Sequence, residues 1–281
     1  MTDRTLSATA DVSRHYSRGN LLELLRRELT AEGIDPDHPT VAQLAPFDHF
    51  HGRGLEATRE LADRVAVSPS DRILDVGSGI GGPARYFADR FGCRITGIDL
   101  TQEFCDVAQA LTRAVGLDGR VSFQQGDATA LPFPDAAFDG AYSMNVSMNI
   151  ADKRAFYREI RRVLRPGAWL ALSEIAQGPG GAPDYPTPWA ASAATSFLAT
   201  PVATRQALAE TGFALETMRE TTQEALAFNA RARAMVERGE KPPVRSIRLI
   251  HGELARAMTT NGARALAETR VIPIEILCRK T

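Results

Sequence analysis

The sequence predicts an α/β protein built on a doubly wound, mostly parallel sheet of seven strands. From residue 72 onward, short apolar runs alternate with stretches of helical periodicity, which is typical of β-α units with right-handed crossovers. A glycine-rich turn directly follows the first apolar run. The last two strand-like runs are separated by the helical stretch 222–270, which is long for a hairpin connection and indicates a cap inserted before the last strand.

Each strand is expected where a short apolar run is bounded by turn residues. The seven runs are 72–76, 94–100, 121–127, 138–144, 169–175, 213–219 and 271–278. Between them, helical spacing of apolar residues predicts helices at 55–65, 83–91, 102–115, 152–164 and 202–211.

An N-terminal helix is expected at 20–33, outside the central sheet. Leucines form a stripe along it, Asn20 and Glu23 can form a capping box, and Gly33 is a stop signal. We interpret the residues that follow as an irregular link, because prolines interrupt them. These prolines are Pro36, Pro39 and Pro46.

This order of elements predicts four parts of the chain. They are an N-terminal helical lid segment (1–54), a ligand-binding core (55–221) with a Gly- and Pro-rich loop (176–200), a helical cap (222–270) and a closing strand of the core (271–281). The cap is rich in Ala and Arg, which fits an amphipathic solvated surface or the face of a homodimer.

The composition argues against several classes of function. The 281 residues carry 33 Lys and Arg against 34 Asp and Glu, so there is no basic field to attract nucleic acid. We find no signal peptide and no run long enough to span a bilayer, so we expect a cytoplasmic protein without an integral membrane segment. Three cysteines without C-x-x-C spacing fit a reducing compartment and neither a disulfide framework nor a zinc site.

The glycine-rich turn reads D-V-G-S-G-I-G-G and satisfies the G-x-G-x-x-G dinucleotide fingerprint through Gly77, Gly79 and Gly82. In an NAD-binding protein this turn holds a doubly anionic pyrophosphate, which the Asp75 carboxylate would repel. The same carboxylate suits a cationic ligand, such as the ammonium and sulfonium of S-adenosylmethionine. The alternative interpretation is that Asp75 only caps the turn.

Two further acids lie at the ends of the next two strands. Asp99 can accept both hydroxyls of a ribose, and Asp127 can accept a hydrogen bond from an adenine amino group while the Ala128 amide meets a ring nitrogen. Carboxyl ends of parallel strands meet at the edge where open α/β sheets bind ligands. The sequence therefore predicts a nucleoside site at this edge.

Four segments carry a resemblance to a known family. They read I-L-D-V-G-S-G-I-G-G-P-A-R, G-I-D-L, G-D-A-T-A-L-P-F-P-D-A-A-F-D and R-V-L-R-P-G. This ordered set resembles class I S-adenosylmethionine-dependent methyltransferases and is similar to those of the sterol, tocopherol, ubiquinone/menaquinone and sarcosine/dimethylglycine type. The resemblance covers about 55–175 and implies a Rossmann-like core with S-adenosyl-L-methionine as cofactor. The cofactor-binding residues then expected are Asp75, Gly77, Ser78, Gly79, Asp99, Leu100, Thr101, Asp127, Ala128 and Asn145.

The candidates for a general base are His51 and His49, in the segment P-F-D-H-F-H-G-R-G, with Asp48 as a group that could orient one of them. In methyltransferases of this architecture the residues before the core commonly fold over the cofactor. The alternatives are a helix cap, a backbone contact or a surface position. No third ligand stands near the His-x-His pair, so we expect no metal site.

Three residues are expected at an acceptor pocket: Asn149 after the fourth strand, Tyr16 near the N-terminus and Tyr185 in the loop after the fifth strand. Their alternatives are the start of a helix for Asn149, helix packing for Tyr16 and loop anchoring for Tyr185. Methyltransferases that act on amino groups of nucleic-acid bases resemble one another in an Asn/Asp-Pro-Pro-aromatic segment after the fourth strand. This chain has N-V-S-M there, which favours a small-molecule acceptor over a nucleic acid.

The sequence thus predicts an enzyme that transfers a methyl group by in-line displacement to an O, N or C atom of a small metabolite. Quinone-like and terpenoid-like relatives suggest an apolar acceptor, whereas sarcosine-like relatives suggest a polar amine. Two alternatives remain open, which are an NAD-dependent oxidoreductase using the same glycine loop and a non-catalytic protein that binds the cofactor.

Overall fold

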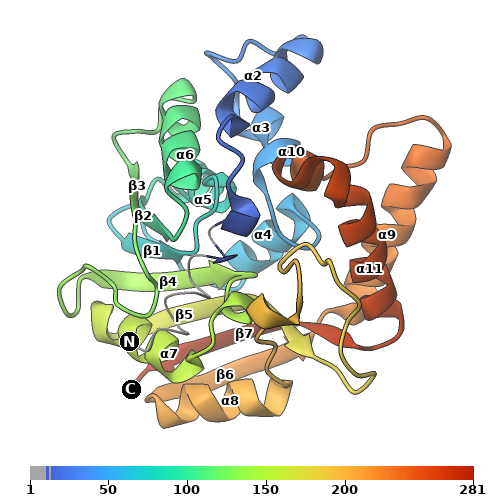
Figure 1. The fold of residues 1–281 in the computed structure, drawn as a ribbon. Coiled ribbons are helices and arrows are strands. Elements are labelled where there is room, and N and C mark those ends of the chain that lie inside the picture. Colours follow the sequence, from blue (N-terminus) through green and yellow to red (C-terminus); the bar gives the residue numbers. More distant parts are fainter. Residues whose placement is uncertain (1–10, 13) are drawn as a thin grey trace.

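The computed structural model describes residues 11, 12 and 14–281, and it contains a seven-stranded sheet with the order β3-β2-β1-β4-β5-β7-β6 (Figure 1). The neighbours from β3 to β5 are parallel, and β7 runs antiparallel to β5 and β6. This confirms the predicted fold class. The strands are β1 (Arg72–Val76), β2 (Arg94–Asp99), β3 (Val121–Gln125), β4 (Phe138–Met144), β5 (Leu164–Gln177), β6 (Phe213–Glu220) and β7 (Val271–Lys280).

Helices cover both faces of the sheet. Successive side chains of β1 point to opposite faces and enter two different apolar cores. Leu74 and Val76 belong to the apolar core beneath α7 and α8, whereas Ile73 belongs to the core beneath α4 and α5. The helices are α4 (Leu55–Asp63), α5 (Gly82–Phe91), α6 (Gln102–Ala114), α7 (Lys153–Val163) and α8 (Pro201–Glu210). Because β1 is buried on both faces, its only route to a ligand is through its carboxyl end.

A third group of helices lies over the carboxyl ends of the parallel strands (Figure 1). These are α2 (Leu21–Ala31), α3 (Val41–Asp48), α9 (Thr222–Glu237), α10 (Ser246–His251) and α11 (Ala255–Ala267). Leucines of α2 form a buried stripe that packs with Phe47 of α3, Phe104 of α6 and Leu249 of α10. Segments from both ends of the chain therefore share one apolar cluster. Within the described residues, every helix is too short or too polar to cross a membrane.

Two local predictions were wrong. Helix α3 occupies part of the expected irregular link, because Thr40 and Gln43 form a reciprocal capping box and Pro46 is accommodated inside the helix. The expected capping box of α2 is absent, since the Asn20 side chain makes no cap hydrogen bond. Instead, the Glu103 carboxylate of α6 accepts the N–H of Leu21 at 3.0 Å and thereby ties the lid to the core.

Candidate active site

One large cavity, of about 1500 Å³, lies where the carboxyl ends of the strands face the lid and cap. Its floor includes Asp75, Asp99 and Asp127, which the sheet brings together from three neighbouring strands or the turns that follow them. Its walls include His51 before α4 and Phe228 of α9. All ten residues expected to bind the cofactor line this cavity, including Ser78, Leu100 and Thr101.

The glycine loop adopts a backbone that few other residues tolerate. Gly77 has φ 76° and Gly79 has φ 53°. A Cβ on Gly77 would lie 2.2 Å from a methyl group of Val146, whereas a Cβ on Gly79 would meet nothing within 4 Å. The N–H groups of Gly77 and Ser78 both donate to the Ile98 carbonyl, at 2.8 and 3.0 Å. The loop is thus fastened to β2 and leaves Gly79 open to the cavity.

The Asp99 carboxylate fixes the same loop from the end of β2. One oxygen accepts the Gly79 N–H at 2.8 Å and the other accepts the Thr101 N–H at 2.9 Å. Burial raises the pKa of Asp99, and these backbone hydrogen bonds oppose that rise. Each carboxylate oxygen has capacity for a second donor, so the group suits two neighbouring hydroxyls.

Asp75 is only 2% exposed and accepts a hydrogen bond from the Tyr142 hydroxyl at 2.9 Å. Burial raises the pKa of Asp75 to about 8, with a contribution from the nearby Asp99. The carboxyl is therefore largely protonated at pH 7. A cation placed beside it in the cavity would favour the ionised form.

This coupling predicts proton release on ligand binding. At pH 7 a carboxyl with a pKa of about 8 is roughly nine-tenths protonated, so binding of S-adenosylhomocysteine, through its ammonium, should release up to about one proton. Calorimetry in two buffers of different ionisation enthalpy measures this number. The release should vanish above about pH 9 and in Asp75→Asn; equal release from Asp75→Asn and from the unmodified chain would contradict the assignment.

Asp127 uses one carboxylate oxygen within its own turn, where it accepts the N–H and the hydroxyl of Thr129 at 2.8 and 2.7 Å. Its second oxygen has no such partner among the described residues. Ala128 lines the cavity beside it. The free oxygen and the adjacent backbone are the groups that an adenine edge requires.

Asn145 follows β4 and has a left-handed backbone, φ 56°. In the amide orientation that satisfies both side-chain atoms, its nitrogen donates to the Ser173 carbonyl and its oxygen accepts the Gly52 N–H, each at 3.2 Å. Asn145 thus joins the lid to the sheet, and its role toward the cofactor remains a prediction.

The two histidines lie in different environments. His51 lines the cavity, and its Nε2 is 3.1 Å from the Thr58 hydroxyl while its Nδ1 is 3.3 Å from the Gly52 carbonyl. Burial lowers the pKa of His51 to about 3, with smaller contributions from His49 and Arg53. The ring is therefore neutral at pH 7. Because the Gly52 carbonyl can only accept, Nδ1 carries the hydrogen and Nε2 is the basic nitrogen.

His49 is completely buried and does not line the cavity. Its Nδ1 lies 2.6 Å from one oxygen of Asp48, whose other oxygen accepts from Arg85 at 2.8 Å. Asp48 thus contacts His49 rather than His51. This geometry favours His51 over His49 for any direct role in the reaction.

Two of the three expected acceptor residues, Tyr16 and Asn149, are joined by a hydrogen bond on the cavity wall. The Tyr16 hydroxyl donates to Asn149 Oδ1 at 3.1 Å, and Asn149 Nδ2 donates to the Trp189 carbonyl at 2.7 Å. Burial raises the pKa of Tyr16 above its usual value. Tyr16 and Asn149 line the cavity, whereas Tyr185 packs beside Trp189 without lining it. Their contact with an acceptor remains a prediction.

Glu174 is a cavity residue that sequence reasoning missed. It lies in β5 and is 2% exposed, and one of its oxygens accepts the N–H groups of Val146 and Ser147 at 3.1 and 3.0 Å. Burial raises the pKa of Glu174 to about 7. Glu174 therefore shapes the turn that presses Val146 against Gly77. The sequence feature that could have identified Glu174 is the presence of an acid within the apolar run W-L-A-L-S-E-I.

Comparison with known proteins identifies the core. Residues 74–172, which carry all three strand-end acids, match the family model described as a methyltransferase domain. The core of this chain is a class I S-adenosylmethionine-dependent methyltransferase domain. Its sheet order and antiparallel β7 agree with that family, and S-adenosylmethionine is the family's cofactor.

Similar proteins act on acceptors of different kinds. Methyltransferase GfsG of Streptomyces halstedii is 34% identical over 59% of this chain and 58% of its own length. Phosphoethanolamine N-methyltransferase 1 of Arabidopsis thaliana is 37% identical over 45% of this chain and 25% of its own. The chain thus spans about three fifths or less of these relatives. The structure of geranyl diphosphate C-methyltransferase from Streptomyces coelicolor A3(2) superimposes with a TM-score of 0.69 at 18% identity, covering 98% of both chains.

The residues of the methyltransferase domain fit this cofactor. The open backbone at Gly79, the two-oxygen acceptor at Asp99 and the free oxygen of Asp127 match the methionine, ribose and adenine parts in turn. Asp75 supplies a carboxyl whose ionisation a cationic group would favour.

Proposed function

We propose that the chain transfers the methyl group of S-adenosylmethionine to a nucleophilic O, N or C atom of a small-molecule acceptor. The observation that carries this proposal is the continuity of the cavity. It runs from the strand-end acids past His51 to an apolar space between α9 and α11. A cofactor held on the floor would present its reactive end to a second molecule in that space.

When bound, S-adenosylmethionine supplies a methyl group attached to a positively charged sulfur. The sulfur is the leaving group and keeps the electron pair of the broken carbon–sulfur bond. The residues of the chain have to align the acceptor with that bond and exclude water. Asp99 and the Gly77–Gly79 loop fix one partner, and the lid and cap enclose the other. No large catalytic apparatus is required.

His51 is the proposed acceptor of a proton from an O–H nucleophile. Its low pKa makes it a weak base, which is sufficient because methylation sharply increases the acidity of the attacking group. The Gly52 carbonyl holds the ring through Nδ1, and Nε2 becomes free to accept the proton when the Thr58 hydroxyl donates to the Met144 sulfur at 3.9 Å instead.

We expect His51→Gln to lower the rate of methyl transfer by about 100-fold while changing the affinity for S-adenosylhomocysteine less than about threefold, because the site for the cofactor stays intact. Single-turnover rates measure the first effect and calorimetry the second. An unchanged rate would show that positioning alone suffices, and the proposed base would be wrong.

The test of the proposed function is turnover with isotope-labelled S-adenosylmethionine. Neutral phenols, terpenoid alcohols, sterols and small amines are offered separately, and label transfer is followed by mass shift. Label transfer to at least one of these classes is expected. Binding of S-adenosylhomocysteine without transfer to any class would favour the non-catalytic alternative, whereas the domain match gives no support to an oxidoreductase.

A further inference from the structure

The cavity is larger than its cofactor requires. A drug-sized ligand occupies a pocket of roughly 300–1,000 Å³, so about 1500 Å³ accommodates the cofactor and a second molecule of similar size. We call the part formed by the cap the acceptor chamber. Its apolar lining includes Phe228, Ala232, Val244, Ile247, Ala263 and Leu266, beside Met148 and Trp189. Asn229, Thr259 and Thr260 are its uncharged polar members.

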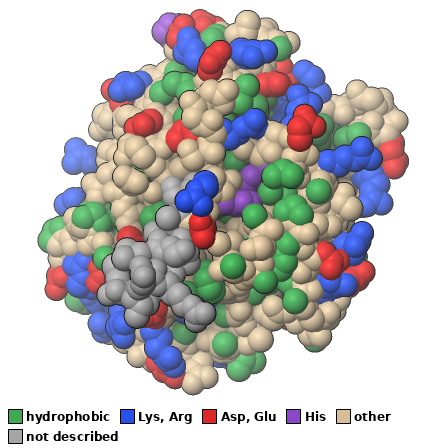
Figure 2. Space-filling model, in the orientation of Figure 1, with side chains coloured by type: hydrophobic (Ala, Val, Ile, Leu, Met, Phe, Trp, Pro, Cys, Tyr) green, Lys and Arg blue, Asp and Glu red, His purple; other side chains and the backbone are tan. Residues whose placement is uncertain are grey.

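Hydrophobic side chains also gather around the opening of the cavity. Figure 2 shows them to the right of a histidine near the centre of the view, on the side where Figure 1 places α11. Val236 at the end of α9 lines the cavity although it is 55% exposed. An apolar molecule could therefore keep contact with the protein from the opening to the interior.

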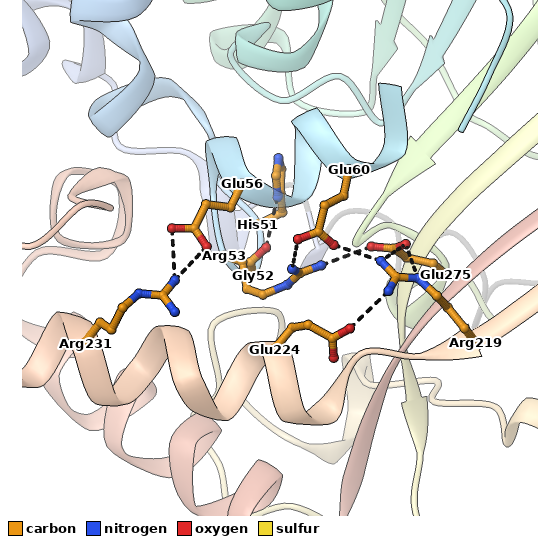
Figure 3. Close-up of polar contacts among 9 residues, drawn as sticks. All are labelled: His51, Gly52, Arg53, Glu56, Glu60, Arg219, Glu224, Arg231 and Glu275. Atoms are coloured by element: carbon orange, nitrogen blue, oxygen red, sulfur yellow. Dashed lines mark hydrogen bonds and ion pairs between the residues drawn. The ribbon is translucent and has the colours of Figure 1, made fainter. Parts of the chain in front are cut away.

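The buried cation closest in sequence to His51 is already neutralised. Arg53 is 6% exposed and donates to Glu60 at 2.7 Å and to Glu275 at 3.0 Å (Figure 3). Arg219 donates to the other oxygens of the same two carboxylates, at 2.8 and 2.9 Å. The four side chains form a closed ring in which each carboxylate binds both arginines, so none of them offers a free charge to a ligand.

The remaining basic side chains around the chamber are paired or face solvent, whereas Glu174 is a buried acid of the cavity wall. Glu174 holds the turn after β4, and Arg231 of α9 points out of the chamber to Glu56 of α4, with contacts of 3.0 and 2.7 Å (Figure 3). Among the described residues, the cavity-lining arginines without a carboxylate partner on α9 and α11 are Arg233 and Arg256, and both are exposed. The interior thus lacks a free cation to pair with a buried carboxylate or phosphate.

From this we propose that the methyl acceptor is a bulky, mostly apolar molecule without an anionic group, whose single nucleophilic group reaches His51 while its body fills the acceptor chamber. The inference rests on the proposed function and resolves the choice between apolar and ionic acceptors. A small acceptor that carries a carboxylate or phosphate would lose its hydration in the chamber without gaining an ion pair, which is strongly unfavourable.

The first test uses Nile red, a neutral fluorophore that brightens in apolar surroundings, with the unmodified chain saturated by S-adenosylhomocysteine. We expect it to bind and to be displaced by farnesol or estradiol at micromolar concentration. Sarcosine and O-phosphoethanolamine should not displace it even at millimolar concentration. Displacement by the two charged compounds alone, or no binding of Nile red, would overturn the proposal.

The second test locates the site with variants that fill the chamber. Ala232→Trp and Ala263→Trp should each weaken Nile red binding by at least about tenfold, whereas Ala209→Trp, on the exposed face of α8, should not change it. Affinity for S-adenosylhomocysteine should stay within about twofold in all three. Equal Nile red binding by all three variants would place the dye elsewhere and contradict the proposal. Failure of the unmodified chain to bind S-adenosylhomocysteine would instead contradict the proposed function.

Discussion

Replacing Asp99 with alanine is expected to weaken the binding of S-adenosylhomocysteine by at least about 100-fold, because hydrogen bonds to a charged group contribute roughly 1.5–3 kcal/mol each. Two ribose hydroxyls would lose their acceptor. The Gly79 and Thr101 amides would also lose theirs, so the loop that carries the methionine end would no longer be fixed. Calorimetric titration measures the change directly.

The matched control is Asp106→Ala. Asp106 is an exposed acid of the adjoining helix α6 whose carboxylate accepts only from Gln102, at 2.7 Å. The affinity of the Asp106→Ala protein for S-adenosylhomocysteine should equal that of the unmodified chain. An unchanged affinity in a folded Asp99→Ala protein would mean that the ribose is held elsewhere.

Arg85→Ala is expected to lower the free energy of unfolding by about 3–5 kcal/mol, because it leaves the buried Asp48 carboxylate without its arginine. The guanidinium is fully buried and donates to Asp48 at 2.8 Å, to the Ile80 carbonyl at 2.7 Å and to Thr112 at 3.1 Å. It therefore joins lid helix α3 to the glycine loop and to α6. Urea-induced unfolding measures the loss.

Arg90→Ala provides the control on the same helix. The Arg90–Asp63 pair is solvent-exposed at 36% and 60%, so its loss should cost less than about 1 kcal/mol. If Arg85→Ala were no more destabilising than Arg90→Ala, the buried contact would not support the lid.

The Asp48 carboxyl also makes the free energy of unfolding depend on pH. Burial alone would raise the pKa of Asp48, but contacts with His49 and Arg85 outweigh it and hold the pKa below its usual value. Its contribution is thus present above the unfolded pKa of about 3.9 and disappears as the pH falls through the lower folded value. Without Arg85, burial raises the folded pKa of Asp48. We therefore expect the difference between Arg85→Ala and Arg90→Ala to shrink as the pH falls through that raised value.

The sheet and the cofactor edge were predictable because they depend on local signals. Buried parallel strands are continuous apolar runs, and the side chain after each run points to the ligand edge. Asp75, Asp99 and Asp127 could therefore be placed at one site before any contact was known. Helix α3 was missed because Pro46 is normally read as an interruption, whereas the capping box at Thr40 outweighs it.

The acceptor side depends on contacts between distant segments, which no local pattern reveals. Tyr16 meets Asn149 across 133 residues, and Arg53 meets Glu275 across 222 residues. Periodicity could not distinguish His49 from His51 either, since the two lie two residues apart. Their difference arises because Arg85 holds Asp48 in the core, whereas Arg53 and Gly54, both with positive φ, turn the chain that follows His51.

The most direct test of the central claim is a calorimetric titration of the unmodified chain with S-adenosylhomocysteine and, in parallel, with NADH. We expect one site with micromolar affinity for S-adenosylhomocysteine and no detectable heat of binding with NADH. Binding of NADH in the absence of S-adenosylhomocysteine binding would contradict the assignment of the strand-end acids and of the cavity above them.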